Sequence, residues 1–272
     1  MSRFAVRDAI MQLDPIRDDQ RIVFLSSRCD FPFDTSRALE FALLRTFCVP
    51  SISTLLDSTG EYIHRPRKRN YDTSMIFREL IEWGYDSDRG ARALQRMNEA
   101  HGRYAIVNDD LLYVLSAITF GLIRWNERYG WRRMCEPERL GYFHFWRHVG
   151  QRMNIEHIPT DYLSFECFNR DYEQQHYCFT ASSHRLGCAI REAWVSRHPR
   201  WAAPLVRHAM NATLDEPARN ALGFPRPPRL LRWFMPCVHR LRSSMARRRS
   251  SRDQRAIHRP ASAEGEPRKS CD

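Results

Sequence analysis

The chain has 272 residues, of which 43% are apolar and 28% are charged, so it can fill a sizeable core and is not disordered as a whole. Only 11 residues are glycine, and neither G-x-G-x-x-G nor G-x-x-x-x-G-K-[ST] occurs, which excludes the common phosphate-binding motifs and disfavours a glycine-rich β-sandwich. Residues 226–272 hold thirteen basic and four acidic side chains, so most of the formal net charge of +11 belongs to this tail.

The cysteine pattern and the hydropathy of the sequence predict where in the cell the protein is located. The eight cysteines include no C-x-x-C pair, which is typical of reduced thiols in the cytosol rather than of disulfides or a zinc ribbon. The longest uncharged stretch, 111–123, has 13 residues, fewer than the roughly 20 that a membrane-spanning helix needs. The N-terminus also has no apolar signal-peptide core. We therefore expect a cytoplasmic protein without a signal peptide or transmembrane helix, whose membrane contact, where it has any, is peripheral.

Helix signals recur along the chain, and strand signals are nearly absent. Asp14 and Pro15 open the first predicted helix, toward Arg28, because aspartate caps a helix N-terminus and proline suits its first turn. Ser87 and Asp88 open another helix, which ends at the pair 101–102. The other predicted helices are 37–47, 70–83, 108–129, 136–153, 160–179, 182–198, 202–213 and 215–222. These roughly ten helices predict an all-α fold, with one domain over residues 1–228.

The character of the chain changes after the prolines at 225–228. Residues 229–246 mix arginines with apolar residues, among them Trp233 and Phe234, and predict a basic amphipathic helix. Two interpretations stay open: segment 229–249 contacts an anionic membrane peripherally, or the helix packs on the body of the protein. Residues 247–272 are predicted to be disordered. No helix-turn-helix, zinc-finger or RNP signature occurs, so we expect no specific nucleic-acid partner.

A histidine on an apolar helix face is the first candidate site residue. Leu94, Met97 and His101 follow each other at i, i+3 and i+7, so His101 shares one helix face with two core residues. The commoner interpretation of such a residue is a core histidine with its hydrogen bonds satisfied. The sharper one is a neutral imidazole ligand of a metal.

A second candidate lies about thirty residues earlier in the chain. Arg69 and Thr73 are four residues apart, so a helix brings a permanent cation and a hydroxyl to one side. The alternative is a surface ion pair between Arg69 and Asp72, which would contribute well under about 1 kcal/mol. A pair of histidines, His144 and His148, also has a metal-ligand spacing, but it lacks the H-E-x-x-H pattern.

Several motifs resemble a known family. The main segments are Arg69-x-x-Asp72-Thr73, Met97-Asn98-x-x-His101-Gly102-Arg103-Tyr104 and Asn108-Asp109-Asp110-Leu111-Leu112-Tyr113-Val114-Leu115. Supporting stretches include Phe41-x-x-x-Arg45, Phe145-Trp146-Arg147 and Tyr172-Glu173-x-x-His176. In order and spacing, over about residues 14–228, they resemble the MpaB-type oxygenases, a family that also contains the latex-clearing rubber oxygenases. The likeness is greater to the MpaB branch.

The resemblance implies a globin-like helical core that holds one haem b. His101 matches the family's proximal histidine ligand of the haem iron, and Arg69 and Thr73 match its distal polar pair. Asn98 and His176 are carried over as further cofactor-binding residues, with His176 the second choice of iron ligand.

The sequence departs from the family pattern at one position. Rubber-cleaving members have a lysine directly before the distal threonine, able to occupy the sixth position of the iron. This chain has Asp72 there, which we group with the catalytic residues but which cannot act as an amine ligand. The departure argues against rubber itself as the substrate.

The resemblance therefore predicts a haem-dependent oxygenase that uses O2 to cleave a carbon–carbon double bond in a prenyl-type hydrophobic substrate. A proximal histidine leaves one face of the haem iron for dioxygen, and the cofactor supplies the oxidation chemistry. Two alternatives stay open. One is a non-catalytic haem or O2-binding protein that senses or stores, and the other is a membrane-adhering helical protein that binds no haem.

Overall fold

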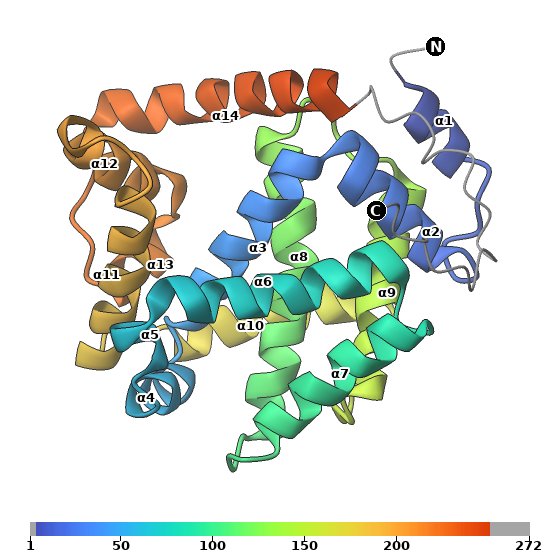
Figure 1. The fold of residues 1–272 in the computed structure, drawn as a ribbon, viewed down its shortest axis with the longest axis horizontal. Coiled ribbons are helices and arrows are strands. Elements are labelled where there is room, and N and C mark those ends of the chain that lie inside the picture. Colours follow the sequence, from blue (N-terminus) through green and yellow to red (C-terminus); the bar gives the residue numbers. More distant parts are fainter. Residues whose placement is uncertain (1–3, 251–272) are drawn as a thin grey trace, which may run out of the picture.

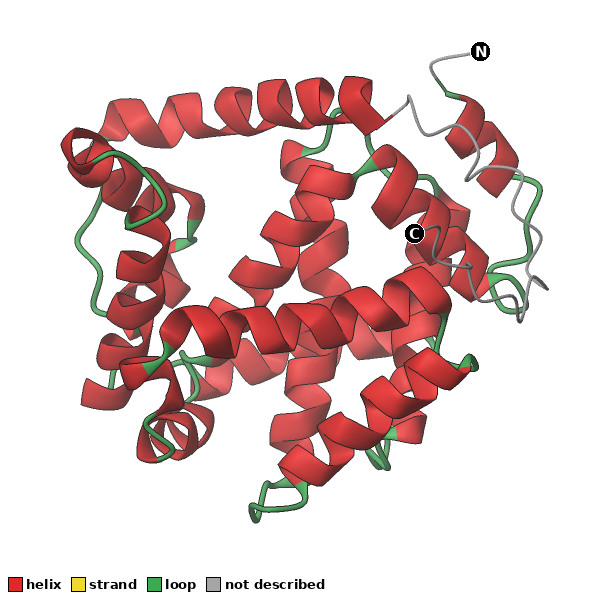
Figure 2. Ribbon diagram, in the orientation of Figure 1, coloured by secondary structure: helices red, strands yellow, loops and turns green. Residues whose placement is uncertain are grey.

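A computed structural model describes residues 4–250, with the backbone alone for residues 247–250, and every regular element in that part of the chain is a helix (Figure 2). The α-helices are α1 (Ala5–Ile10), α2 (Asp19–Phe24), α3 (Pro32–Thr46), α4 (Pro50–Ser58), α5 (Glu61–His64), α6 (Pro66–Trp83), α7 (Asp88–His101), α8 (Asn108–Tyr129), α9 (Glu136–Arg152), α10 (Tyr162–His176), α11 (Ala181–Val195), α12 (Ala203–Thr213), α13 (Glu216–Ala221) and α14 (Arg229–Ser250). A π-helical turn spans Leu25–Asp30, and a 3-10 turn spans Arg200–Ala202. The prediction of an all-α fold is confirmed.

The described residues form fourteen α-helices, more than the roughly ten predicted, because short elements escaped the sequence patterns. The first predicted helix does not start at Asp14. Its carboxylate accepts the backbone N–H of Ile16 at 2.8 Å and closes a turn, and α2 begins only at Asp19. The six-residue helix α1 and the four-residue helix α5 have too few residues to show a helical period.

The core is built around α8, which crosses the middle of the molecule with α3 beside it (Figure 1). α8 carries fourteen buried residues, including Phe120, which is fully enclosed. Gly121 lets the two helices approach closely, because a Cβ at this position would lie 2.9 Å from the Cβ of Ala42 on α3. The stretch 111–123, predicted from its hydropathy to be a buried core helix, is the central part of α8.

Helices α6 and α7 form a hairpin that opens away from its turn (Figure 1). Gly84 takes a positive φ of 80° in the turn, a conformation that favours glycine. Ser87 caps α7 by accepting the backbone N–H of Gly90 at 3.0 Å, as the sequence predicts. The turn is compact, since a Cβ on Gly90 would come within 1.9 Å of the Gly84 carbonyl oxygen.

A buried ionic network joins α9 to the π-helical turn. The Arg132 guanidinium binds the carboxylates of Asp30 and Glu138, which are 1% and 0% exposed, with 2.7 Å between its Nη1 and Glu138 Oε2. Ser26 donates a further hydrogen bond to Glu138 at 3.0 Å. Both carboxylates and the cation are therefore satisfied inside the protein.

Helix α14 lies along one edge of the molecule and packs against α3, α8 and α12 (Figure 1). His239 packs against the neighbouring rings of Trp125 and Tyr129, with centroid distances of 5.0 and 4.7 Å. Ser243 donates a hydrogen bond to the buried carboxylate of Asp34. The interpretation that this segment packs on the body therefore agrees with the structure.

The boundary predicted between the C-terminal helix and the tail differs from the structure. α14 includes residues 247–250, which were predicted to begin the disordered tail, and the remainder of that tail, 251–272, lies outside the described residues. Within residues 4–250, no single helix combines the length and the apolar character needed to cross a membrane. In the part of the chain that the structure describes, only α3 and α4 taken together meet that test, and they are bent by 96° relative to each other.

Candidate functional site

Helix α6 places Arg69 and Thr73 on one side, as their spacing predicts. The Arg69 guanidinium donates a hydrogen bond to the Thr73 hydroxyl, which itself donates to the Arg69 carbonyl oxygen at 3.1 Å. Phe77, one turn further along the same side, is buried in the core. Arg69 and Thr73 therefore extend the inward side of α6 toward the open end of the hairpin.

The surroundings of Arg69 are unusual for a half-buried cation. Its guanidinium carbon lies 5.1 Å from the centre of the buried Tyr62 ring on α5, and no carboxylate pairs with it among the described residues. The alternative of an Arg69–Asp72 ion pair is not observed. Asp72 instead accepts from Lys68 at 2.6 Å, and both side chains are about half exposed or more, at 48% and 64%. Arg69 thus keeps hydrogen-bonding capacity for another group.

His101 ends α7 and lies close enough to Arg69 to sense its charge. The ring is half-buried, and within the described part of the chain it has no hydrogen-bond partner. Burial lowers the pKa of His101, and the positive charge of Arg69 lowers it further. The imidazole is therefore held in its neutral form, the form in which histidine binds a metal. Leu94 and Met97 are buried as the predicted apolar face requires.

Tyr62 is a residue of this cluster that the sequence did not indicate. It is 3% exposed, beneath the Arg69 guanidinium. Burial raises the pKa of its phenol, while Arg69 and a hydrogen bond with Thr73 oppose the rise. Tyr62 lies on the four-residue helix α5, and no local pattern links it to α6. The cluster of Tyr62, Arg69, Thr73 and His101 is called the histidine–arginine site below.

The other predicted site residues occupy different surroundings. Asn98, one turn before His101, donates from Nδ2 to the Arg152 carbonyl oxygen at 3.0 Å and so ties α7 to the end of α9. His176 is exposed at the end of α10, stacked on Tyr172 with a centroid distance of 4.0 Å. The structure gives it no contact with the histidine–arginine site, and Asp72 lies on the outer side of α6.

One of the two paired histidines of α9, His148, also has structural partners. His148 Nδ1 lies 2.7 Å from Asp19 and 2.8 Å from the Tyr85 hydroxyl, so it belongs to a polar cluster that joins α9 to α2. No group of three or more His, Cys, Asp or Glu side chains among the described residues is arranged to hold a metal ion. A site of that kind would differ from haem, which needs only one or two side-chain ligands.

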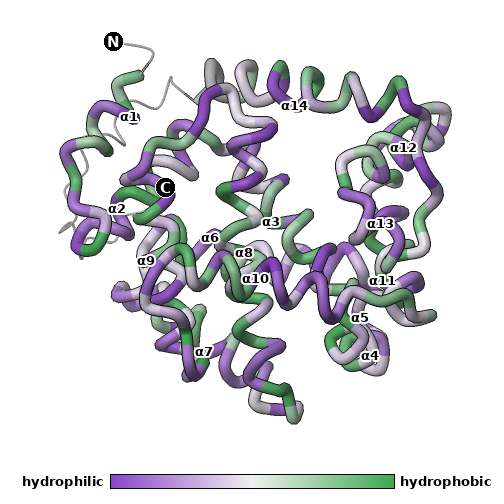
Figure 3. The backbone as a smooth tube through the Cα atoms, turned by 180° about the vertical axis from the view of Figure 1, so that it is seen from behind, coloured by the Kyte–Doolittle hydropathy of each residue, from purple (hydrophilic) through white to green (hydrophobic). Residues whose placement is uncertain are grey.

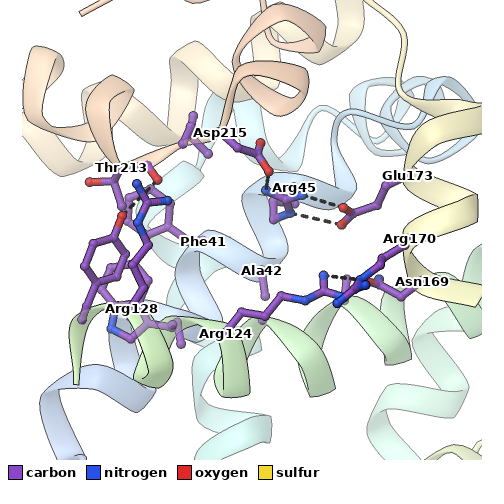
Figure 4. Close-up of a pocket in the computed structure, with 16 residues that line it drawn as sticks. Phe41, Ala42, Arg45, Arg124, Arg128, Asn169, Arg170, Glu173, Thr213 and Asp215 are labelled. Carbon is purple, nitrogen blue, oxygen red and sulfur yellow. Dashed lines mark hydrogen bonds and ion pairs between the residues drawn. The ribbon is translucent and has the colours of Figure 1, made fainter. Parts of the chain in front are cut away.

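A pocket of about 350 Å³ lies between α3, α8, α10 and the segment 213–215 (Figure 4). Arg45 crosses its wall and binds Glu173 with distances of 3.1 and 2.6 Å and Asp215 at 2.8 Å. Arg124 donates to Asn169 at 2.7 Å. None of the predicted site residues lines this pocket. Arg45 and Glu173, which lie in the family-like stretches of the sequence, hold α3 and α10 together here.

The fold and the histidine–arginine site define an all-helical protein in which a neutral histidine lies near a cation and a hydroxyl. A family model described as "ER-bound oxygenase mpaB/B'/Rubber oxygenase, catalytic domain" matches residues 56–247. The chain belongs to this family. The predicted resemblance is confirmed, and the match includes α6, α7 and most of α14.

Curated relatives from two species of Penicillium agree with the family. "ER-bound oxygenase mpaB'" of Penicillium brevicompactum is 24% identical over 220 residues, which are 74% of this chain and 52% of the relative. "ER-bound oxygenase mpaB" of the same species is 28% identical over 55% of this chain and 43% of the relative. The protein of that name in Penicillium roqueforti (strain FM164) is 31% identical over 48% of this chain and 46% of the relative. The matched part of the chain thus spans about half the length of these relatives.

Proposed function

We propose that this protein is a haem b-dependent oxygenase that uses O2 to cleave a carbon–carbon double bond in a prenyl-type hydrophobic substrate. The family and the names of the relatives support an oxygenase. The observation that carries the haem is the half-buried His101 ring, which is neutral, has no hydrogen-bond partner among residues 4–250, and lies near Arg69.

The residues at the histidine–arginine site fit a haem by their chemistry. His101 is the residue that would ligate the iron, since its imidazole is free of competing hydrogen bonds within the described chain and is kept deprotonated by its surroundings. α6 and α7 diverge from their connecting turn, and Arg69 and His101 lie toward the ends of these helices that are far from the turn (Figure 1). When bound, the haem would supply the activation of dioxygen.

The role of Arg69 and Thr73 would be electrostatic. Arginine side chains are permanent cations, and the contact of Arg69 with Thr73 orients both groups on one side of α6. A fixed cation and hydroxyl, already oriented before reaction, favour the negative charge that oxygen gains as it is reduced. Tyr62 beneath the guanidinium restricts its position and excludes water from that side.

The overall reaction balances without a further reductant. Cleavage of one carbon–carbon double bond by one dioxygen molecule gives two carbonyl ends, and both oxygen atoms remain in the products. Such a substrate needs hydrocarbon surroundings, which apolar side chains of α8 and of the inward side of α6 would have to supply.

An absorption spectrum and an oxygen electrode test the proposal in two steps. Protein expressed with ample haem should show a Soret band, which His101→Ala should lose. His176→Ala is the matched control, because His176 is an exposed histidine at the end of another helix, and it should keep the band. Wild-type protein that stays colourless, or a band that survives in His101→Ala, would contradict the haem site.

The second step separates an oxygenase from a protein that only binds haem. The haem-loaded protein should consume O2 when a prenyl-chain hydrocarbon is added, and mass spectrometry should detect aldehyde or ketone ends labelled from 18O2. A normal Soret band with no substrate-dependent uptake would instead favour the sensing or storage alternative.

A further inference from the structure

Helix α14 exposes its apolar side and buries a partly polar one, the reverse of an ordinary surface helix. Its buried residues are Met235, His239 and Ser243, spaced four apart along the seam against the body. On the outside, Leu230 is 68% exposed and Trp233 is 73% exposed. Hydrophobic and hydrophilic residues alternate along the helix (Figure 3). The body of the protein therefore does not account for the apolar residues of α14.

The exposed apolar residues form one continuous stripe. They are Leu230, Trp233, Phe234, Val238, Leu241 and Met245, all at least 41% exposed. Apart from the adjacent pair Trp233 and Phe234, they follow each other at spacings of three and four residues, which repeat on one side of an α-helix, roughly opposite the seam at 100° per residue. The stripe thus extends over about four helical turns, far more than an isolated exposed leucine.

Arginines border the stripe on both sides. At 100° per residue, Arg229 and Arg240 fall between the stripe and one edge of the seam, and Arg242 falls toward the other edge. All three are exposed, and residues 229–250 contain no Asp or Glu at all. A helix with an apolar face, flanking cations and no acidic residue has the charge complementarity of an anionic lipid surface.

The seam holds α14 in this orientation. Besides Ser243, which binds Asp34 and accepts the backbone N–H of Trp131 at 3.1 Å, His239 Nε2 lies 3.2 Å from the Thr213 hydroxyl. The helix therefore cannot turn its apolar stripe inward without breaking these polar contacts. The aromatic rings of Trp233 and Phe234 meet at a centroid distance of 5.0 Å on the outer side, where they can enter the headgroup region together.

We propose that α14 is a membrane-docking helix, which lies in the plane of an anionic lipid surface with its apolar stripe inserted and its arginines at the phosphates. This surface is distinct from the histidine–arginine site, because α14 packs on α3, α8 and α12 whereas the site residues lie on α5, α6 and α7. Docking of this kind would bring the body of the protein to the place where a hydrophobic substrate is dissolved.

Vesicle flotation tests the proposal with the full-length protein and no haem requirement. The protein should float with vesicles of mixed phosphatidylserine and phosphatidylcholine, and less with phosphatidylcholine alone. Leu230→Gln with Leu241→Gln should lower the bound fraction about tenfold or more, because two outward-facing leucines leave the stripe. Arg229→Gln with Arg242→Gln, which removes one bordering cation from each side of the stripe, should weaken binding to the anionic vesicles and reduce its dependence on salt.

A matched control pair is available away from α14, with Val107 directly before α8 and Leu163 on α10. Val107 and Leu163 are 63% and 70% exposed, close to the 62% and 68% of Leu241 and Leu230, so Val107→Gln with Leu163→Gln should float as the wild type does. All these side chains point outward, and circular dichroism should show unchanged helix content in each variant.

Three results would overturn membrane docking. One is wild-type protein that stays with the soluble fraction in the presence of anionic vesicles. Another is equal loss of flotation in the α14 pair and the control pair. The last is a concentration-dependent dimer, detected by sedimentation and abolished by the α14 pair, without any flotation, since the stripe would then join two copies of the chain.

Discussion

Arg132 and Arg69 show how differently one protein can surround two inward-facing arginines. Arg132, 7% exposed, is enclosed by the carboxylates of Asp30 and Glu138, and each of the three groups is hydrogen-bonded to an oppositely charged partner. Arg69 has no carboxylate partner in the described chain, and its contacts are an aromatic ring and a hydroxyl of its own helix, while its positive charge lowers the pKa of His101. The arrangement around Arg132 stabilises the fold, whereas the arrangement around Arg69 leaves its N–H donors and its positive charge available to a ligand.

This difference indicates which of the two regions is suited to activity and which to stability. A buried network with all its hydrogen bonds made contributes specificity to the fold but offers nothing to a ligand. A cation and a neutral imidazole that have no strong partners retain donor and acceptor groups for one. The comparison predicts that substitutions in the first region change stability and those in the second change activity.

The largest expected effect is on stability, at Arg132. Arg132→Met removes the cation and leaves two buried carboxylates uncompensated, which should cost about 3–5 kcal/mol of unfolding free energy. Urea unfolding followed by circular dichroism measures it, with Arg69→Met as the matched control, for which we expect a loss below about 1 kcal/mol. Equal losses in the two variants would remove the distinction between the regions.

The next effect is on activity, at Arg69. In the haem-loaded protein, Arg69→Ala should lower kcat about 10²–10³-fold, the usual cost of removing one preorganised electrostatic donor, and leave the Soret band in place. Arg69→Lys should recover part of the rate, because it restores the charge but not the planar donor fork. An unchanged kcat in Arg69→Ala would show that the unpaired cation is not used in the reaction.

The sequence predicted the parts of this comparison that depend on local patterns. Spacing placed Arg69 with Thr73 on one side of a helix, and Ser87 predicted the start of α7, which puts His101 at its end. Neither Tyr62 beneath Arg69 nor the partners of Arg132 could be predicted in that way. Arg132 meets Asp30 across 102 residues of chain, and such pairs are set by how helices pack rather than by any periodicity.

His239 is a buried polar group of a third kind. It forms no ion pair within the described residues and is not open to a ligand, and its surroundings keep its imidazole uncharged. Burial lowers its pKa to about 4, with help from the nearby charges of Arg242, Arg37 and Arg128. The unfolded chain takes up a proton near pH 6.5, so the folded state should lose up to about 3 kcal/mol as the pH falls from 6.5 to 4.

Urea unfolding of wild-type protein and His239→Gln across this pH range measures the effect. The difference between their unfolding free energies should shift in favour of the variant as the pH falls. Asp34 in the same seam acts in the opposite direction in both proteins, because burial raises its pKa to about 6 and its carboxyl is most favourable when protonated. A difference that stays constant with pH would mean that His239 is not kept neutral.

The smallest expected effect is at Asp72, which the sequence groups with the catalytic residues and the structure places in an exposed ion pair with Lys68. Asp72→Asn should change the unfolding free energy by less than about 0.5 kcal/mol, because an exposed pair four residues apart on a helix contributes little. With its carboxylate directed toward Lys68, away from Arg69, we expect kcat and the Soret band to stay within twofold of the wild type, roughly the limit of an indirect electrostatic effect across solvent. Lys68→Gln is the control, since it breaks the same ion pair from the other side. A fall in kcat in Asp72→Asn that Lys68→Gln does not reproduce would show that Asp72 takes part in the reaction. The histidine–arginine site would then include a charged group on the outer side of α6.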